Sequence, residues 1–329
     1  MEGNKKILIR KVSHDDFDGL VKLYEEVWPD TDYNKSEKAN FVLNESKGVS
    51  YLAELDGKIV GSRTSFFQHL YWGNRPLRCV HLGDSCVHSS CRGKGLFLKM
   101  NGSFLKDFFS AAVEGEIIYN ISVYASRKAY EKLGWHYIES LMALRKFPNL
   151  IQVVWHAKLN PRNLSQPIVW DRESKIKQIG IDLLGKREEF FSKTPLLHVR
   201  YDAETFSWRM KSKNGIKVFI DDFGAIVYKI GKRKEIVEVL IGEVFLKSYS
   251  KNNLRQIIKK LSSSLHPDII SVWVSEGHPL RPWYEDLHFL HNPKQKYLHH
   301  GVRVVSEEMK EIAYNPYNWA ISSLDIDTF

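Results

Sequence analysis

The sequence predicts a mixed α/β fold (an α+β arrangement built on a mixed sheet) that occurs in two tandem copies. Three observations support this. A strand, a glycine turn and the start of a helix follow one another at 79–97. A hairpin of apolar strands precedes this unit, and a tyrosine followed five residues later by an aromatic residue occurs at both Tyr130 and Tyr284. Alternating strands and helices of this kind indicate a sheet covered by helices.

The first half begins with a helix and continues with antiparallel strands. Ser13 and Asp16 form a predicted capping box before an apolar-faced helix at 17–28. The pair Asp56-Gly57 then predicts a tight hairpin between strands within 51–70, because this dipeptide tolerates the positive φ values of such turns. A further turn leads into the strand that precedes the glycine segment.

The glycine segment is the most informative part of the chain. It reads Arg92, Gly93, Lys94, Gly95, Leu96 and Phe97. Glycines let the backbone turn tightly and approach a ligand, and the first N–H groups of the following helix lack internal partners. These donors and the helix dipole favour an anion, and a pyrophosphate is the expected ligand. The alternative is an ordinary solvated turn.

These residues resemble a known family. Arg92-x-x-Gly95-x-Phe97 is similar to the Arg/Gln-x-x-Gly-x-Gly/Ala loop of the GCN5-related N-acetyltransferases (GNAT), which holds the pyrophosphate of an acyl-coenzyme A in that superfamily. The segment from Tyr130 to Trp135 resembles the family's Tyr-x-x-x-Gly-aromatic signature. The resemblance covers approximately residues 5 to 147. Phe97 departs from the usual small residue, and Ser126 stands where many members carry Asn.

The resemblance implies a set of site residues. Besides the glycine segment and Ser126, it implies that the backbone N–H of Cys86 or Val87 stabilises the carbonyl oxygen as charge develops on it. Tyr130 is implied as the proton donor to the departing thiol, whose pKa is about 8.5. Its alternative role is that of a packed aromatic residue.

Two residues of the strand before the loop are candidates for the base, His81 and Asp84. Histidine has a pKa near ~6.5, which suits proton removal at neutral pH. Asp84 would instead need a raised pKa or would orient the amine as a cation. The two cannot share one face of a strand without a bulge, and each has a purely structural alternative. Cys86 and Cys91 are less suited as acyl-carrying nucleophiles, since direct transfer needs no covalent intermediate.

The domain organisation follows from the repeat. We expect an acyl-CoA-binding GNAT domain at 1–147, a connecting segment at 148–195 and a degenerate GNAT-like domain at 196–329. The second copy has no glycine between its strand near Phe245 and its helix near Leu254, so we expect it to lack the pyrophosphate loop. Its remaining roles are to wall the acceptor cleft, to form a homodimer or to support the first copy.

The resemblance predicts an acyl-CoA-dependent N-acyltransferase. Two-domain members with one intact loop transfer acetyl or 3-hydroxybutanoyl groups to dTDP-linked dideoxy amino sugars, so the expected acceptor is a nucleotide-linked amino sugar for surface polysaccharide. The C-terminal pattern from Trp319 to Asp327 resembles that of tandem GNAT proteins from surface-polysaccharide loci. The alternatives are a Fem-type aminoacyltransferase using aminoacyl-tRNA and a non-catalytic acyl-CoA-binding regulator.

Composition and charge limit the expected ligands, cysteine chemistry and cellular location of the protein. The chain has 329 residues, a net charge of +9 and three cysteines, with no metal-ligand spacing and no disulfide framework expected. Its basic clusters are interpreted as solvated faces, and a small-molecule acceptor is expected rather than nucleic acid or membrane. The charged N-terminus and the lack of any ~18-residue apolar run predict a cytoplasmic protein.

Overall fold

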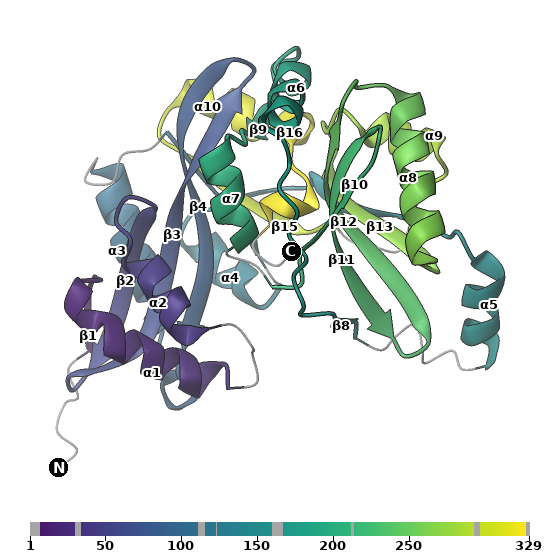
Figure 1. The fold of residues 1–329 in the computed structure, drawn as a ribbon. Helices are drawn as coiled ribbons and strands as arrows, with labels where there is room; N and C mark the ends of the chain where they lie inside the picture. Colours follow the sequence, from purple (N-terminus) through teal and green to yellow (C-terminus); the bar gives the residue numbers. More distant parts are fainter. Residues whose placement is uncertain are drawn as a thin grey trace. The chain divides into compact units, whose positions relative to one another are not determined.

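The computed structural model describes residues 7–29, 34–110, 116–122, 124–159, 167–211, 214–292 and 297–326. The chain divides into two compact units (Figure 1). Unit 1 comprises residues 1–70, 76–138 and 299–314, and unit 2 comprises residues 71–75, 139–298 and 315–329. Each unit therefore contains segments that are distant in the sequence.

Unit 1 is a mixed sheet covered by helices. Its strands are β1 (Ile7–Lys11), β2 (Gly48–Leu55), β3 (Lys58–Trp72), β4 (Arg75–Val87), β5 (Ile117–Ser122), β6 (His136–Ile138) and β15 (His299–Val304). Its helices are α1 (Phe17–Val27), α2 (Lys35–Leu43), α3 (Leu96–Phe109), α4 (Tyr124–Lys132) and α10 (Glu307–Ala313). The sheet order is β1-β2-β3-β4-β5-β15-β6, and β4 and β5 pair in parallel. The mixed pairing confirms the predicted fold class.

Capping and turn residues of unit 1 adopt the local conformations that their types favour. Asp16 accepts hydrogen bonds from the backbone N–H and the hydroxyl of Ser13, which is the expected capping box before α1. Asp56 and Gly57 have φ values of 51° and 79°, so the β2–β3 connection is the expected tight turn. Gly134, at a φ of 75°, follows the end of α4 in the left-handed conformation, which glycine adopts without strain.

The two faces of this sheet carry separate cores. On one face, side chains of α3 and α4, including Met100 and Phe104, pack on alternate residues of the strands, including Leu82. On the other face, α1 and α2 pack on the intervening residues, including Leu52 and Cys86. Because strand side chains alternate between faces, the membership of a residue in one core shows which way it points.

Unit 2 repeats this architecture. Its strands are β7 (Leu141–Lys146), β8 (Val169–Trp170), β9 (Leu197–Val199), β10 (Lys217–Ile220), β11 (Gly224–Arg233), β12 (Ile236–Leu246), β13 (Ile269–Ser275), β14 (Leu290–His291) and β16 (Trp319–Ala320). Its helices are α5 (Leu150–Leu159), α6 (Ile181–Phe191), α7 (Ala203–Lys211), α8 (Lys251–Leu265) and α9 (Arg281–Asp286). The sheet order is β10-β11-β12-β13-β7-β14, with β12 and β13 parallel.

The repeated tyrosine motif has the same geometry in both units. Tyr130 and Trp135 make an edge-to-face contact with centroids 5.0 Å apart, and Tyr284 and Phe289 do so at 5.2 Å. In each case the backbone N–H of the second aromatic residue donates to the backbone carbonyl of the tyrosine, and the residue before that aromatic residue has a positive φ. The second copy places His288 where the first has a glycine. Each half of the chain thus carries one copy of the motif in the same geometry.

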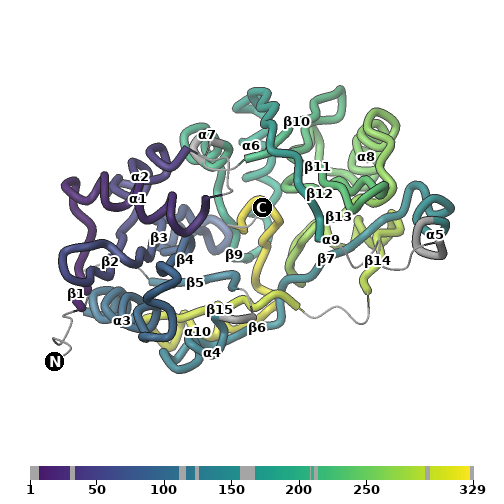
Figure 2. The backbone as a smooth tube through the Cα atoms, turned by 90° about the horizontal axis from the view of Figure 1, so that it is seen from below, coloured from purple at the N-terminus to yellow at the C-terminus, as the bar shows by residue number. Residues whose placement is uncertain are grey.

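The two halves of the chain exchange one strand. In unit 1, β15 from the C-terminal half lies between β5 and β6 and pairs antiparallel with both (Figure 2). In unit 2, β7 from the N-terminal half occupies the corresponding gap between β13 and β14. Each sheet is therefore completed by a strand from the other half, which explains why neither compact unit is continuous in sequence.

The segment at 148–195 contains more structure than the sequence predicts. This segment, which the sequence predicts as a connection, contains the two helices α5 and α6. The Ile151 and Trp155 side chains of α5 are exposed, whereas Val153 is buried, so the apolar residues of this helix do not form one buried face. No helix in the described residues is both long and apolar enough to cross a membrane.

Candidate active site at the β4–α3 loop

The glycine segment adopts the geometry that an anion site needs. Gly93 and Gly95 have φ values of 77° and 71°, and Gly95 is the N-cap of α3 with no side-chain cap. The backbone hydrogen bond from the Lys99 N–H to the Gly95 carbonyl is the first of the helix. The N–H groups of the first turn, from Leu96 onward, come before this bond and have no carbonyl acceptor within the helix. A Cβ on either glycine would meet no atom within 4 Å. The loop thus opens onto free space.

Charged side chains flank this open turn. Arg92 and Lys94 are exposed, and the Arg92 Nε lies 3.4 Å from the Val87 carbonyl oxygen at the end of β4. Both cations lie within the sequence that turns from β4 into α3, beside the helix N-terminus. Positive side chains and helix dipole therefore act on the same place, which favours a phosphate-bearing ligand.

Phe97 does not block the loop. Its ring packs edge to face on Tyr130, with centroids 5.3 Å apart, and joins the core between α3 and the sheet. The side chain that departs from the family pattern is thus turned into the protein rather than into the turn. The backbone amide of Phe97 keeps its place in the first turn of α3.

A backbone irregularity in β4 decides where the candidate bases point. Asp84 has a φ of 45°, which breaks the alternation of the strand. Leu82 packs in the α3 core, whereas Asp84 makes an ion pair of 2.8 Å with Lys38 of α2 on the other face. By alternation His81 also faces away from α3. The irregularity at Asp84 therefore places both candidate bases on the face of the sheet that points away from α3.

The two candidate bases differ in accessibility. The His81 residue is 1% exposed, and its ring stacks on Tyr119 with centroids 4.5 Å apart. Next to it, burial lowers the pKa of His300 to about 3, with a further contribution from His81. The Asp84 side chain is 35% exposed. Of the two, Asp84 is the one that an acceptor from solvent can reach.

Tyr130 is held by a residue that the sequence did not single out. Tyr130 is buried, and its hydroxyl oxygen accepts a hydrogen bond of 2.7 Å from Arg63 Nη2 of β3. Ser126 precedes Tyr130 by one turn of α4, so both lie on one side of that helix. An arginine within the otherwise uncharged part of β3, at 59–66, is the one sequence signal that could have indicated Arg63.

The cysteines lie inside the protein rather than in the open loop. All three thiols are free and buried. Burial raises the pKa of the Cys86 thiol to about 12, and it also raises that of Cys79. A thiolate is the reactive form of cysteine, so burial disfavours a covalent role for Cys86. Cys86 and Val87 remain candidates through their backbone amides at the end of β4.

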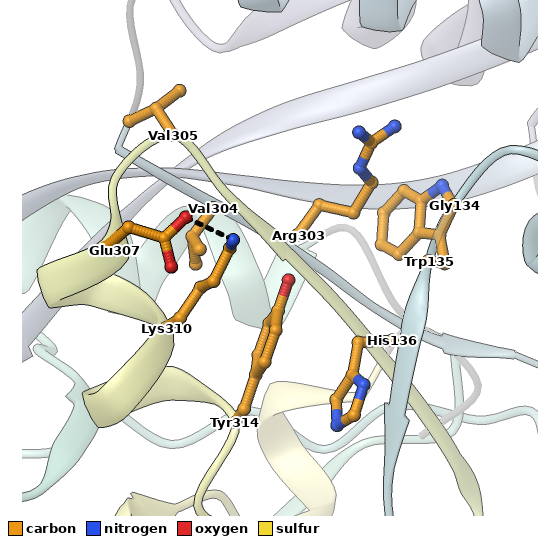
Figure 3. A pocket seen from close by; sticks show the side chains of 9 residues that line it. All are labelled: Gly134, Trp135, His136, Arg303, Val304, Val305, Glu307, Lys310 and Tyr314. Carbon is orange, nitrogen blue, oxygen red and sulfur yellow. Dashed lines mark hydrogen bonds and ion pairs between the residues drawn. The ribbon is translucent and has the colours of Figure 1, made fainter.

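Unit 1 also has a cavity away from the predicted residues. It has a volume of about 560 Å³ and is lined by Gly134, Trp135, His136, Arg303, Lys310 and Tyr314, among others (Figure 3). These side chains come from the β6 region, β15 and α10. The cavity contains none of the predicted site residues, and Lys310 is paired with Glu307 within it. It is therefore not the loop site.

The corresponding helix of unit 2 is closed to an anion. The N-cap of α8 is Ser250, whose hydroxyl accepts a hydrogen bond of 3.2 Å from the Asn253 N–H. The side chain of Asn253 in turn donates to the Ser248 carbonyl. This helix thus satisfies part of its first turn with its own side chains, whereas α3 has only a glycine there. The contrast agrees with the missing second loop.

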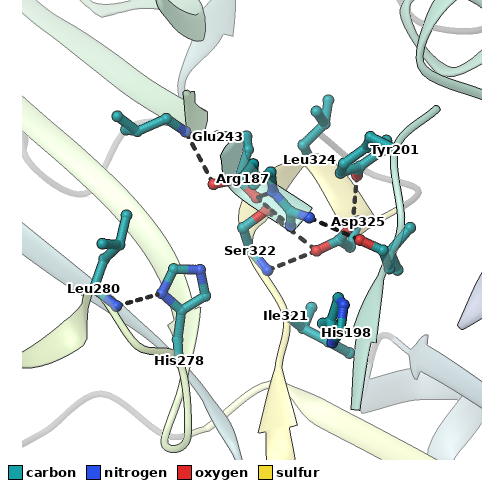
Figure 4. A network of polar contacts seen from close by, with 12 residues as sticks. Arg187, His198, Tyr201, Glu243, His278, Leu280, Ile321, Ser322, Leu324 and Asp325 are labelled. Atoms are coloured by element: carbon teal, nitrogen blue, oxygen red, sulfur yellow. Dashed lines mark hydrogen bonds and ion pairs between the residues drawn. The ribbon is translucent and has the colours of Figure 1, made fainter. Parts of the chain in front are cut away.

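The C-terminal pattern is built into a buried network of unit 2. Asp325 accepts hydrogen bonds from the Tyr201 hydroxyl and from the backbone N–H of Ser322 (Figure 4). Burial raises the pKa of Asp325. Nearby, the buried Arg187 pairs with Glu243. The described part of this pattern thus has a structural role, and Asp327 lies outside the described residues.

The described residues contain no group of three or more side chains suited to hold a metal ion. The acyl carrier can be assessed on the loop itself. The free space beside Gly93 and Gly95 and the amides before the α3 ladder fit a pyrophosphate, because the backbone can come close without a Cβ in the way. Residues 92–97 would hold that part of the carrier.

Comparisons with known proteins agree with this geometry. Residues 8–138 match the family model of the acetyltransferase (GNAT) domain. No curated protein sequence matches the chain.

Solved structures share the fold over nearly the whole chain. A GCN5-related N-acetyltransferase from Anabaena variabilis is 12% identical, with 92% of this chain and 73% of that chain covered and a TM-score of 0.62. One from Kribbella flavida is 11% identical, with coverages of 94% and 74% and a TM-score of 0.61. A putative acetyltransferase from Pyrococcus horikoshii is 10% identical, with coverages of 98% and 95% and a TM-score of 0.50.

Proposed function

From the match of residues 8–138 to the acetyltransferase (GNAT) domain, we propose that the protein is an acyl-CoA-dependent N-acyltransferase, and we propose its substrate and its place of action. The enzyme moves an acetyl or 3-hydroxybutanoyl group from coenzyme A to the amine of a nucleotide-linked (dTDP) amino sugar. It acts in the cytoplasm, and its product serves surface polysaccharide. The support for this acceptor is the resemblance to two-domain GNAT enzymes with one intact loop.

One observation carries the proposal. The two glycines at the start of α3 have positive φ values and face free space, whereas α8 begins with a serine that caps its own helix. A chain with two GNAT-like copies thus has one helix N-terminus prepared for a pyrophosphate. Residues 92–97 and Ser126 are the proposed carrier-binding residues, and the second unit serves another role.

The chemistry assigns a task to each part of the site. The amine nitrogen attacks the thioester carbonyl, and the backbone N–H of Cys86 or Val87 stabilises the oxyanion that forms. The carbon–sulfur bond then breaks, and the thiolate takes the proton of the Tyr130 hydroxyl. Asp84 holds the acceptor amine as a cation until its proton is lost to water, or removes that proton itself. His81, enclosed beside Tyr119, is the less accessible alternative.

A thiol-release assay tests the proposal. Purified protein is incubated with acetyl-CoA or 3-hydroxybutanoyl-CoA and a panel of dTDP-linked amino sugars, simple amino sugars and other primary amines. The expected result is free thiol that appears only with a nucleotide-linked amino sugar, together with an acylated product of the matching mass. Activity with simple amines alone would reject the nucleotide-linked acceptor and leave the enzyme class in place.

Two further outcomes identify the alternatives. Binding of acyl-CoA without thiol release on any amine would indicate a regulator. Binding of aminoacyl-tRNA with a steep dependence on salt, and none of acyl-CoA, would indicate a Fem-type enzyme. The variant Gly95→Trp, which fills the free space at the loop, is expected to abolish acyl-CoA binding by calorimetry while the circular dichroism spectrum stays unchanged.

A further inference from the structure

Arg63 is a buried cation at the centre of the candidate site. It is 2% exposed and lies in β3. Its Nε donates to Asn101 Oδ1 at 3.0 Å, its Nη1 donates to the Gly83 carbonyl at 3.0 Å and to the Ser85 hydroxyl, and its Nη2 donates to the Tyr130 hydroxyl at 2.7 Å. All of these acceptors are uncharged.

The absence of an anionic partner is unusual for a buried arginine. Within the described residues, no carboxylate forms an ion pair with Arg63. A second fully buried arginine, Arg187, pairs with Glu243 and with Glu188, each at 2.8 Å. Burying a charge without a counter-charge is costly, and it is retained where the charge has a task. The charge of Arg63 is thus available to an anion that forms during the reaction.

The partners of Arg63 are the parts of the site that must be held together. Gly83 and Ser85 flank Asp84, where β4 bulges. Asn101 lies in α3 and donates its side-chain N–H to the Phe97 carbonyl in the first turn of that helix, at 2.8 Å. One guanidinium therefore connects the β4 bulge, the helix of the glycine loop and the tyrosine of α4.

We propose that Arg63 is a positioning residue that holds the Tyr130 hydroxyl for proton transfer to the departing thiolate and stabilises the negative charge formed there. The proposal rests on the proposed acyl transfer at this site. Because Arg63 donates to the hydroxyl oxygen, the hydroxyl proton points away from the guanidinium. A phenolate formed at Tyr130 would face a cation that is already in place.

The step balances as follows. The new carbon–nitrogen bond forms with the electron pair of the amine, and the carbon–sulfur bond breaks with its electron pair on sulfur. The thiolate takes the proton from the Tyr130 oxygen, which leaves a phenolate beside Arg63. The amine loses one proton to water, and Tyr130 regains one from water, so the products are the amide and free coenzyme A thiol. Arg63 keeps its own protons throughout.

Kinetics of Arg63→Met, Arg63→Lys, Tyr130→Phe and the double variant Arg63→Met/Tyr130→Phe test the proposal. Loss of a general acid typically lowers kcat by about 10²-fold or more, and this is expected for Tyr130→Phe and for Arg63→Met. The KM for acyl-CoA should change by less than about 3-fold, because Arg63 acts on the transition state. Arg63→Lys keeps the charge and is expected to recover about 10-fold over Arg63→Met.

Three readouts separate this role from a purely structural one. The double variant should be no more than about 3-fold slower than Tyr130→Phe alone, since both changes remove the same step. The alkaline limb of the kcat–pH profile, which reflects deprotonation of the general acid, should be absent in Tyr130→Phe, should move to higher pH in Arg63→Met and should stay near its wild-type position in Arg63→Lys. As a matched control, Arg303→Lys changes a half-buried arginine of the same unit, which donates to the Leu133 carbonyl, and should leave kcat unchanged.

The outcomes are distinct from those that test the acyl transfer itself. If the wild-type protein shows no acceptor-dependent thiol release, the proposed function fails and this inference fails with it. If the wild type is active but the effects of Arg63→Met and Tyr130→Phe multiply, or if the alkaline limb of Arg63→Met stays at its wild-type position, only the role of Arg63 is overturned. Should Arg63→Met not fold, Arg63→Lys with its KM, kcat and pH profile decides alone.

Discussion

Two glycines of one structural segment make a matched pair for testing the loop. Gly95 caps α3 at a φ of 71°, and Gly102 lies in the middle of the same helix. A Cβ on either would meet no atom within 4 Å. Replacement by alanine therefore introduces no clash at either position, and the two variants differ only in the backbone conformation that the new residue must adopt.

The expected changes in stability have opposite signs. An alanine in the left-handed region costs roughly 1–2 kcal/mol, and the loss of unfolded-state freedom on replacing glycine returns about 0.4–1 kcal/mol. Gly95→Ala should thus destabilise the protein by about 1 kcal/mol. Gly102→Ala should stabilise it by roughly 0.5–1 kcal/mol, because alanine suits a helix interior better.

The affinity for acyl-CoA gives a second readout. In Gly95→Ala the new methyl group occupies space beside the first-turn amides, and we expect the Kd to rise by about 10-fold, which equals about 1.4 kcal/mol. Gly102→Ala should bind as the wild type does. Urea unfolding measures the stabilities, and titration calorimetry with acetyl-CoA measures the affinities. If Gly95→Ala stabilised the protein as Gly102→Ala does, or if its Kd stayed the same, the argument from the loop would be refuted.

Further predictions concern acid stability, the base and the exchanged strand. Burial lowers the pKa of His278 from 6.5 to about 3, so between these values the unfolded chain binds a proton that the folded chain does not. The free energy of unfolding should therefore fall by about 2 kcal/mol from pH 7 to pH 5. His278→Asn keeps an acceptor for the Leu280 N–H, and it should remove this pH dependence of the free energy of unfolding, as measured by urea titration at each pH. Asp84→Asn should lower kcat by about 10²-fold and leave the affinity for acyl-CoA unchanged. Lys38→Met, which removes the ion-pair partner of Asp84, should lower kcat less. Equal activity of Asp84→Asn and the wild type would exclude Asp84 as the base. Val302→Ala, at a fully buried position of β15, should cost about 2 kcal/mol and speed amide exchange in β5 and β6; exchange confined to unit 2 would contradict the observed pairing.

Much of the loop could be predicted from the sequence because its determinants are local. The positive φ values of Gly93 and Gly95, the capping box at Ser13 and the turn at Asp56-Gly57 each depend on residues within a few positions of one another. The same holds for the tyrosine motif, whose two copies share one geometry. Steric limits on the backbone and short-range hydrogen bonds act over this distance, so residue type alone is informative.

The tertiary structure decided what depends on distant parts of the chain. Arg63 meets Gly83, Asn101 and Tyr130, which are 20, 38 and 67 residues away, and no local pattern brings these groups together. The bulge at Asp84, which turns the carboxylate toward α2, is likewise a property of the folded sheet.

The strand exchange is the clearest case. Leu141–Lys146 follows the first half in sequence, yet it pairs with β13 and β14, and His299–Val304 pairs with β5 and β6. A strand's own residues specify its alternation and therefore its two faces, but they do not specify which neighbour supplies its backbone hydrogen bonds. The sequence by itself thus determined the loop, its helix and the repeat, and the pairing of whole strands determined which residues meet around them.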